Sequence, residues 1–185
     1  TGNHDWINQE EFITSGIALN ERSSTTTAII KFAYDRGIDL YDNSFASYVQ
    51  VQDANRGAVI SDNARATNIN VKEHRSIGIQ VKDSGSIGNS LVNTSLCTQD
   101  TEGQNPSCDF EDRASESLGI FPTVGYHLAE SGSVANSIAD NNAIGFVVAS
   151  KPNDVDDVRI TKTKSINNRQ MGYLIQEGPT FLSEV

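Results

Sequence analysis

Seven short segments of the chain repeat one pattern of hydrophobic and polar positions: glycine, apolar, variable, aliphatic, variable and, in six of the seven, acidic. The residues one and three places after each glycine are apolar, and the residue between them varies, which is the two-residue period of a strand with one buried face. A helix would place apolar residues three and four apart. Each segment is therefore predicted to be a β-strand. The segments begin at Gly16, Gly37, Gly57, Gly78, Gly125, Gly145 and Gly172.

The spacing of these glycines indicates a repeat. The intervals are 21, 20, 21, 47, 20 and 27 residues, and a second, weaker strand pattern follows most segments, for example at 48–52 and 68–72. A unit of about 20 residues cannot bury its own apolar face, so it must stack on similar neighbours. Parallel strands stacked in this way form a solenoid. We expect each glycine to lie at a sharp corner where a Cβ atom would crowd the turn.

The repeated segments resemble the right-handed β-helix repeats of the pectin-lyase-like superfamily over nearly the whole chain from Gly16 onward. The resemblance implies an all-β fold, a right-handed parallel β-helix solenoid of about seven coils. The superfamily includes polysaccharide lyases, uronan epimerases, glycoside hydrolases, phage tailspikes and repeat domains of surface proteins, so the fold alone does not select an activity. The Asp-Pro-His-Asp string of the epimerases and the paired-aspartate and Gly-His set of polygalacturonases are both absent.

The domain organisation follows from the repeat. Residues 1–15 are expected to form an N-terminal cap in which Trp6 and Phe12 fold over the first coil, and residues 16–185 form the solenoid. The 47-residue interval is interpreted as one coil with an inserted loop at 96–118. Insertions in solenoids fall on one edge and often border a binding surface, although a decorative surface loop explains the segment equally well. The start at Thr1 and Gly2 suggests a domain excised from a larger parent.

The two cysteines, Cys97 and Cys108, bracket a polar stretch within this insertion. Their spacing fits no common zinc pattern. A disulfide closing the loop is the favoured interpretation, and two free thiols are the alternative. A disulfide would imply an oxidising compartment, so we expect a secreted, cell-surface or virion-associated protein.

Most of the residues proposed for chemistry lie around the fourth glycine. Enzymes acting on uronic acid polymers must neutralise a carboxylate and abstract an adjacent proton, which requires basic side chains beside a general base. The candidate catalytic residues are Lys72, His74, Arg75 and His127. The candidate substrate-binding residues are Asp39, Tyr41, Gln80 and Lys82. The alternative is that the mixed charges at 72–75 form an ordinary solvated corner of the solenoid.

Two further rows of residues follow from stacking the segments. The position two places after each glycine faces outward, so Val59, Val147 and Leu174 are expected to expose apolar surface to a partner or a covering loop. The acidic residues that end the segments form a column with a spacing of about 4.8 Å. Calcium is suited to bridge a pair of them, but turn residues that accept backbone hydrogen bonds explain the position without a cofactor, and we favour that explanation.

The net charge of −10 disfavours nucleic acid as a partner, and no apolar run approaches the length needed for membrane insertion. The leading hypothesis is an extracellular carbohydrate-active domain that binds or processes a polysaccharide, with lyase or epimerase chemistry if it is an enzyme. The alternative is a non-catalytic structural or adhesive segment of a larger surface or tailspike protein. That alternative predicts a homotrimer or contacts with other domains of the parent protein.

Overall fold

The computed structural model describes residues 15–94, 123–149, 157–176 and 178–185. Every regular element within these ranges is a β-strand, and none of them contains a helix that could cross a membrane. The predicted disulfide between Cys97 and Cys108, the inserted loop at 96–118 and most of the predicted cap at 1–15 lie outside the described residues. The all-β prediction is confirmed for the described chain.

The strands form two parallel sheets. The first sheet contains the seven predicted glycine segments, paired in chain order. Its strands are β1 (Ser15–Leu19), β3 (Arg36–Leu40), β5 (Arg56–Ile60), β7 (Ile77–Val81), β10 (Val124–Leu128), β13 (Ile144–Val148) and β16 (Met171–Ile175). β7 pairs directly with β10, so the long interval between Gly78 and Gly125 leaves these two glycines in adjacent strands.

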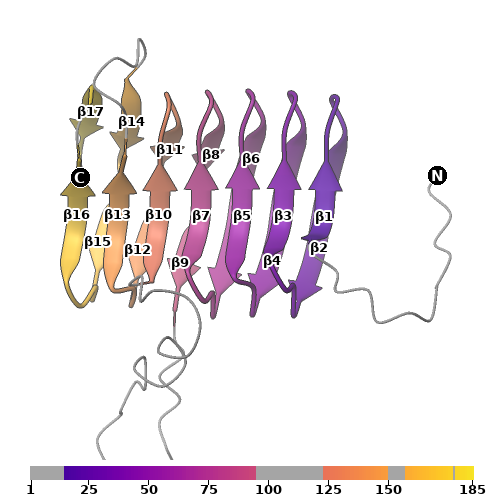
Figure 1. The fold of residues 1–185 in the computed structure, drawn as a ribbon, viewed down its shortest axis with the longest axis horizontal. Helices are drawn as coiled ribbons and strands as arrows, with labels where there is room; N and C mark the ends of the chain where they lie inside the picture. Colours follow the sequence, from indigo (N-terminus) through magenta and orange to yellow (C-terminus); the bar gives the residue numbers. More distant parts are fainter. Residues whose placement is uncertain (1–14, 95–122, 150–156, 177) are drawn as a thin grey trace, which may run out of the picture.

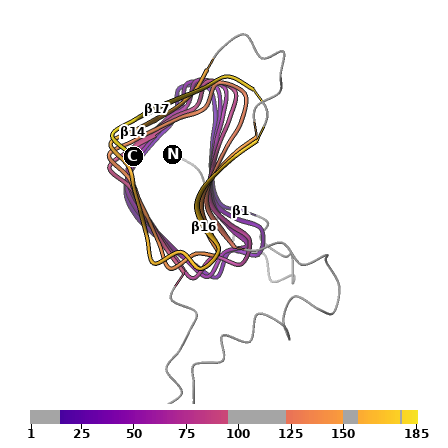
Figure 2. The ribbon, with the colours of Figure 1, turned by 90° about the vertical axis from the view of Figure 1, so that its left-hand side faces the viewer.

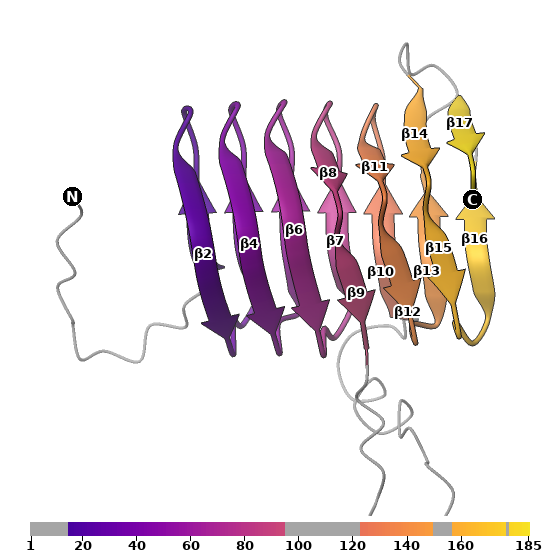
Figure 3. The same cartoon turned by 180° about the vertical axis from the view of Figure 1, so that it is seen from behind.

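The second sheet has ten strands, also parallel, which follow the strands of the first sheet in the sequence. They are β2 (Ser24–Lys31), β4 (Phe45–Gln52), β6 (Arg65–Lys72), β8 (Ser86–Gly88), β9 (Leu91–Asn93), β11 (Ser133–Ala135), β12 (Ile138–Asp140), β14 (Val158–Thr161), β15 (Lys164–Ile166) and β17 (Thr180–Ser183). The chain thus alternates between the sheets, and we call each passage through both sheets a repeat. The ten-stranded sheet lies behind the seven-stranded sheet in Figure 1 and in front of it in Figure 3.

The repeats superimpose when viewed along their row, as Figure 2 shows, and the seven-stranded sheet is bent toward the interior. This arrangement of curled parallel sheets is compatible with a β-solenoid. The core between the sheets is aliphatic in the early repeats, with Ile38, Leu40 and Ile60 fully buried. In the later repeats Tyr126, Phe146 and Tyr173 stack with ring centroids 4.8 and 4.9 Å apart.

The repeat glycines lie inside the strands rather than at corners, which corrects the expectation from the sequence. A Cβ atom built on Gly57 would lie 2.3 Å from a methyl carbon of Val71 on the opposite sheet and 2.5 Å from the carbonyl oxygen of Gly78. Gly37 and Gly78 meet valines in the same way, at 2.2 Å. Glycine is therefore required because the two sheets approach each other closely, not because the chain turns.

The corners of each repeat are made by residues with left-handed backbone angles. After β3, Asp42 and Asn43 have φ of 52° and 63°, and the amide of Ser44 donates to the carbonyl oxygen of Tyr41 at 3.1 Å. Two successive positive φ angles closed by this bond define a type I′ turn, in which Asp and Asn are favoured. The turn explains the acidic column, whose described members all have positive φ: Glu21, Asp42, Asp62, Asp83 and Glu130.

Candidate functional site

The outward side of the seven-stranded sheet carries a continuous row of side chains, which we call the outer row. Its members are neighbours through strand pairing, and from β3 to β13 the residues on either side of them in each strand point into the core. The outer row consists of Asp39, Val59, Gln80, His127, Val147 and Leu174.

Half of the outer row is shielded from solvent although it does not belong to the core: Asp39, Val59 and Val147 are buried, whereas Gln80, His127 and Leu174 are half-buried. Val59 is 4% exposed and Val147 is 7% exposed, yet neither is part of the buried cluster between the sheets. The sheet is bent toward the interior (Figure 2), so its outer side is concave where this row lies. The expectation that these valines expose apolar surface is therefore wrong. Leu174, in the last repeat, is half-buried.

Asp39 is the most buried polar member of the outer row, with 2% of its surface exposed. One carboxylate oxygen accepts a hydrogen bond from the guanidinium of Arg36, and the other, Oδ1, has no hydrogen-bond partner among the described residues. Tyr41 directly follows β3, and burial together with the Asp39 carboxylate raises the pKa of its hydroxyl. These two predicted substrate-binding residues are thus adjacent.

His127 occupies the middle of the outer row, between Gln80 on β7 and Val147 on β13. Burial lowers the pKa of its imidazole, so the ring is neutral at neutral pH. Its Nδ1 atom is buried and has no hydrogen-bond partner in the described part of the chain. Gln80, and Lys82 two residues after it, complete the predicted polar set on this side of the sheet. The structure therefore brings His127 together with Gln80, whereas Lys82 contacts Asp83.

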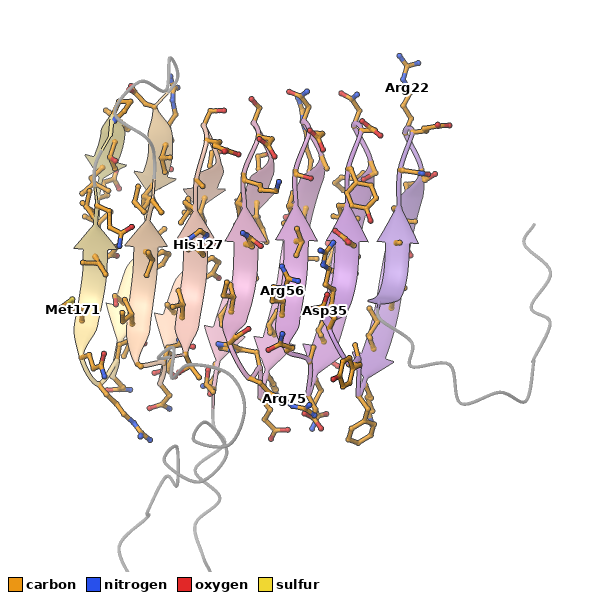
Figure 4. All side chains as sticks on the ribbon, in the orientation of Figure 1. Arg22, Asp35, Arg56, Arg75, His127 and Met171 are labelled. Atoms are coloured by element: carbon orange, nitrogen blue, oxygen red, sulfur yellow. The ribbon has the colours of Figure 1, made fainter. Side chains whose placement is uncertain are left out.

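Three charged residues that the sequence analysis missed lie beside the outer row. The Arg56 guanidinium donates to both oxygens of Asp35, at 2.9 and 3.0 Å, and so links two successive repeats. Arg36 lies between Asp35 and Asp39 and contacts both. Asp35, Arg56 and His127 are on the side of the sheet that faces the viewer in Figure 4. The signal available in the sequence was an arginine directly before the glycine in two consecutive repeats.

The predicted basic cluster at 72–75 is separated by the fold. Lys72 ends β6 in the ten-stranded sheet and is exposed, and Arg75 lies at the corner below β5 in Figure 4 and pairs with Asp53 at 2.7 Å. His74 points into the interior with no exposed surface. A side chain without exposed surface does not contact a polysaccharide, so the catalytic assignment of His74 is corrected to a structural one.

His74 belongs to a buried polar ladder that crosses four repeats. Its ring nitrogens lie 3.1 and 3.3 Å from the hydroxyl of Thr94, which donates to the side-chain oxygen of Asn142 at 2.6 Å. The side-chain oxygen of Asn168 in turn accepts from the backbone amide of Asn142 at 2.9 Å. Burial lowers the pKa of His74 to about 4, and this neutral form is the one the ladder holds at neutral pH.

The described residues do not assemble a metal centre: no three His, Cys, Asp or Glu side chains among them lie close enough together to share an ion. The acidic column faces solvent at the turns, where the left-handed backbone accounts for the residue type. Comparison with protein-family models, with curated proteins and with solved structures finds no match to this chain.

Proposed function

We propose that the chain is a right-handed parallel β-helix of about seven coils, similar to the pectin-lyase-like superfamily, whose outer row binds a polysaccharide. The winding supports the fold assignment. In Figure 1 the seven-stranded sheet runs upward in front, the chain returns downward behind it, and successive repeats move to the left, which is a right-handed path. In Figure 3 the ten-stranded sheet faces the viewer, its strands run downward and successive repeats move to the right, as the same right-handed path requires.

The observation that carries the function is the outer row itself. It is a shielded strip outside the core in which two polar atoms, Asp39 Oδ1 and His127 Nδ1, have no hydrogen-bond partner among the described residues. Buried polar atoms are nearly always hydrogen-bonded, so such atoms on an outward face favour an external partner. Binding sites for small molecules and chains combine apolar lining with a few placed polar groups, and the outer row has this composition.

The geometry supports binding more directly than hydrolysis. Asp39 and His127 are three strand spacings apart, which is about 14 Å at roughly 4.8 Å per strand. At that separation the two groups cannot act on the same glycosidic bond, whereas they can contact different sugar units of one chain. If the domain turns over its ligand, His127 is the proton acceptor, because it is neutral and is the one predicted catalytic residue on this face.

The test is binding of a panel of polysaccharides to the wild type and to a Gln80→Ala/His127→Ala variant, measured by calorimetry and by affinity electrophoresis. We expect at least a tenfold loss of affinity in the double variant. Lys72→Ala is the matched control, because Lys72 is exposed on the other sheet and should leave the affinity unchanged. If Lys72→Ala lowered the affinity and the double variant did not, the binding site would lie near residues 72–75. That result would refute binding by the outer row.

A second candidate function, assembly within a larger surface or virion structure, is favoured by the last repeat. Five large hydrophobic side chains there are exposed: Met171, Ile175, Phe181, Leu182 and Val185. Apolar surface at the open edge of a parallel sheet favours contact with another polypeptide. Light scattering decides this role, because a homotrimer at micromolar concentration would support it and a monomer at every concentration would refute self-assembly.

A further inference from the structure

The basic side chains beside the outer row are all engaged by carboxylates. Arg36 contacts Asp35 and Asp39, Arg56 binds Asp35 at 2.9 Å, and Lys82 lies 2.9 Å from Asp83. Among the described residues of this face, each cation therefore has an anionic neighbour already in place. An acidic sugar would have to compete with these carboxylates for every cation.

Lys82 shows the competition most clearly, since it is the most exposed of these cations. The hydrogen bond to Asp83 is the largest cause that raises its pKa, and the charges of Glu130 and Asp62 act in the same direction. An incoming uronate would therefore have to displace Asp83 from Lys82 and would meet the negative charges of Glu130 and Asp62 as well. The chain as a whole carries a net charge of −10, which adds a long-range repulsion for polyanions.

The remaining side chains of the outer row are either apolar or uncharged groups that can form hydrogen bonds. Along the outer row, Gln80 and neutral His127 are neighbours, with Val59 before them and Val147 and Leu174 after them. The positions that precede the repeat glycines are also apolar from the fourth repeat onward: Ile77, Val124, Ile144 and Met171. Such a surface suits the C–H faces of sugar rings, and the amide and imidazole suit their hydroxyl groups.

From these contacts we propose that the outer row binds a neutral polysaccharide and discriminates against uronate-containing chains. The inference rests on the proposed polysaccharide-binding function and names the substrate class of the same site. The carboxylates that pair with Arg56 and Lys82 act as the discriminating groups, because they remove the free cations that a carboxylated sugar requires.

The experiment compares neutral hexasaccharides of glucose, mannose and xylose with hexagalacturonate and a hyaluronan hexasaccharide, using calorimetry at 50 and 200 mM salt. We expect a neutral hexasaccharide to bind at least tenfold more tightly than either acidic one, with an affinity that salt does not change. Tighter binding of an acidic hexasaccharide, weakened by salt, overturns the substrate class while keeping the binding function. Binding of no member of the panel refutes the binding function as well.

A gain of affinity provides the complementary test. Asp83→Asn removes the carboxylate nearest Lys82 and keeps a residue type that tolerates the left-handed angle of this position, φ 48°. We expect its affinity for hexagalacturonate to rise by up to about fivefold, as for loss of one exposed ion pair, with no change for the neutral ligand. Asp53→Asn, which releases Arg75 at the corner, is the matched control and should change neither affinity. An equal gain in both variants would refute the discriminating role of Asp83.

Discussion

Replacing Gly57 by alanine tests the close approach of the two sheets. The added Cβ atom would lie 2.3 and 2.7 Å from the two methyl carbons of Val71 and 2.5 Å from the carbonyl oxygen of Gly78. Ordinary contacts of a Cβ atom begin at about 3.4 Å, and overpacking of a core costs about 1 to 3 kcal/mol. We expect the upper end of that range, because the carbonyl oxygen belongs to a hydrogen-bonded strand and cannot rotate away.

Thermal and urea unfolding followed by circular dichroism would measure the effect. A loss of about 3 kcal/mol should lower the melting temperature by roughly 6 to 12 °C for a chain of this size. Gly88→Ala is the matched control, since the nearest atom to its added Cβ is 3.8 Å away, and we expect a change within about 0.5 kcal/mol. Gly172→Ala, with contacts of 3.1 and 3.4 Å to Ser165, should fall between the two.

A double-mutant cycle separates the two contacts of the added Cβ atom. Val71→Ala removes the methyl carbons but leaves the oxygen of Gly78 in place, so the pair Gly57→Ala/Val71→Ala should be less destabilised than the sum of the single variants without reaching the stability of Val71→Ala alone. The reasoning would be refuted if Gly57→Ala were no more destabilising than Gly88→Ala. In that case the close contact between the sheets would not be the reason for a glycine at this position.

Three other predictions concern stability. Burial lowers the pKa of His74 from 6.5 to about 4, so between these values the unfolded chain binds more protons, and stability should fall by roughly 3 kcal/mol as the pH drops from 6.5 through 4. In urea titrations across that range, His74→Ala should flatten this part of the profile; an unchanged slope would contradict the assignment. Thr27 has a φ of 63°, which is costly for a β-branched residue. Thr27→Asn should therefore stabilise the fold by about 1 kcal/mol in urea unfolding. A less stable variant would show that the contacts of the threonine side chain contribute more than its backbone strain costs. The buried hydroxyl of Tyr126 lies 2.9 Å from that of Ser90. Tyr126→Phe removes this hydrogen bond and should lower the free energy of unfolding by about 1 kcal/mol in urea titrations. An equally stable variant would show that this hydrogen bond contributes nothing to the stability of the fold.

The sequence by itself determined the strands of the seven-stranded sheet and their order. Each of the seven glycine segments is a strand, and all of them pair in parallel and in chain order. This succeeded because the two-residue alternation and the period of about 20 residues are local properties, which stacking then repeats. The position of the acidic column at turns was also predictable from the sequence, since Asp and Asn favour the left-handed turn that follows each strand.

The tertiary structure decided which side chains reach a surface. Lys72, His74 and Arg75 are adjacent in the sequence, yet one lies on a sheet, one in the interior and one at a paired corner, because a left-handed residue at Glu73 redirects the chain between them. Alternation predicted that Val59 faces outward, but only the inward bend of the sheet makes that outward face a shielded one.

The pairing of Asp35 with Arg56 and the contact of Gly57 with Val71 depend on the stacking of repeats and on the distance between the two sheets. Neither is encoded in one segment: the first joins residues of successive repeats, and the second joins residues of opposite sheets. Local pattern therefore specified the strands and the turns, whereas close packing between elements decided the role of the glycines, the burial of His74 and the chemistry of the outer row, since packing depends on residues that are distant in the sequence.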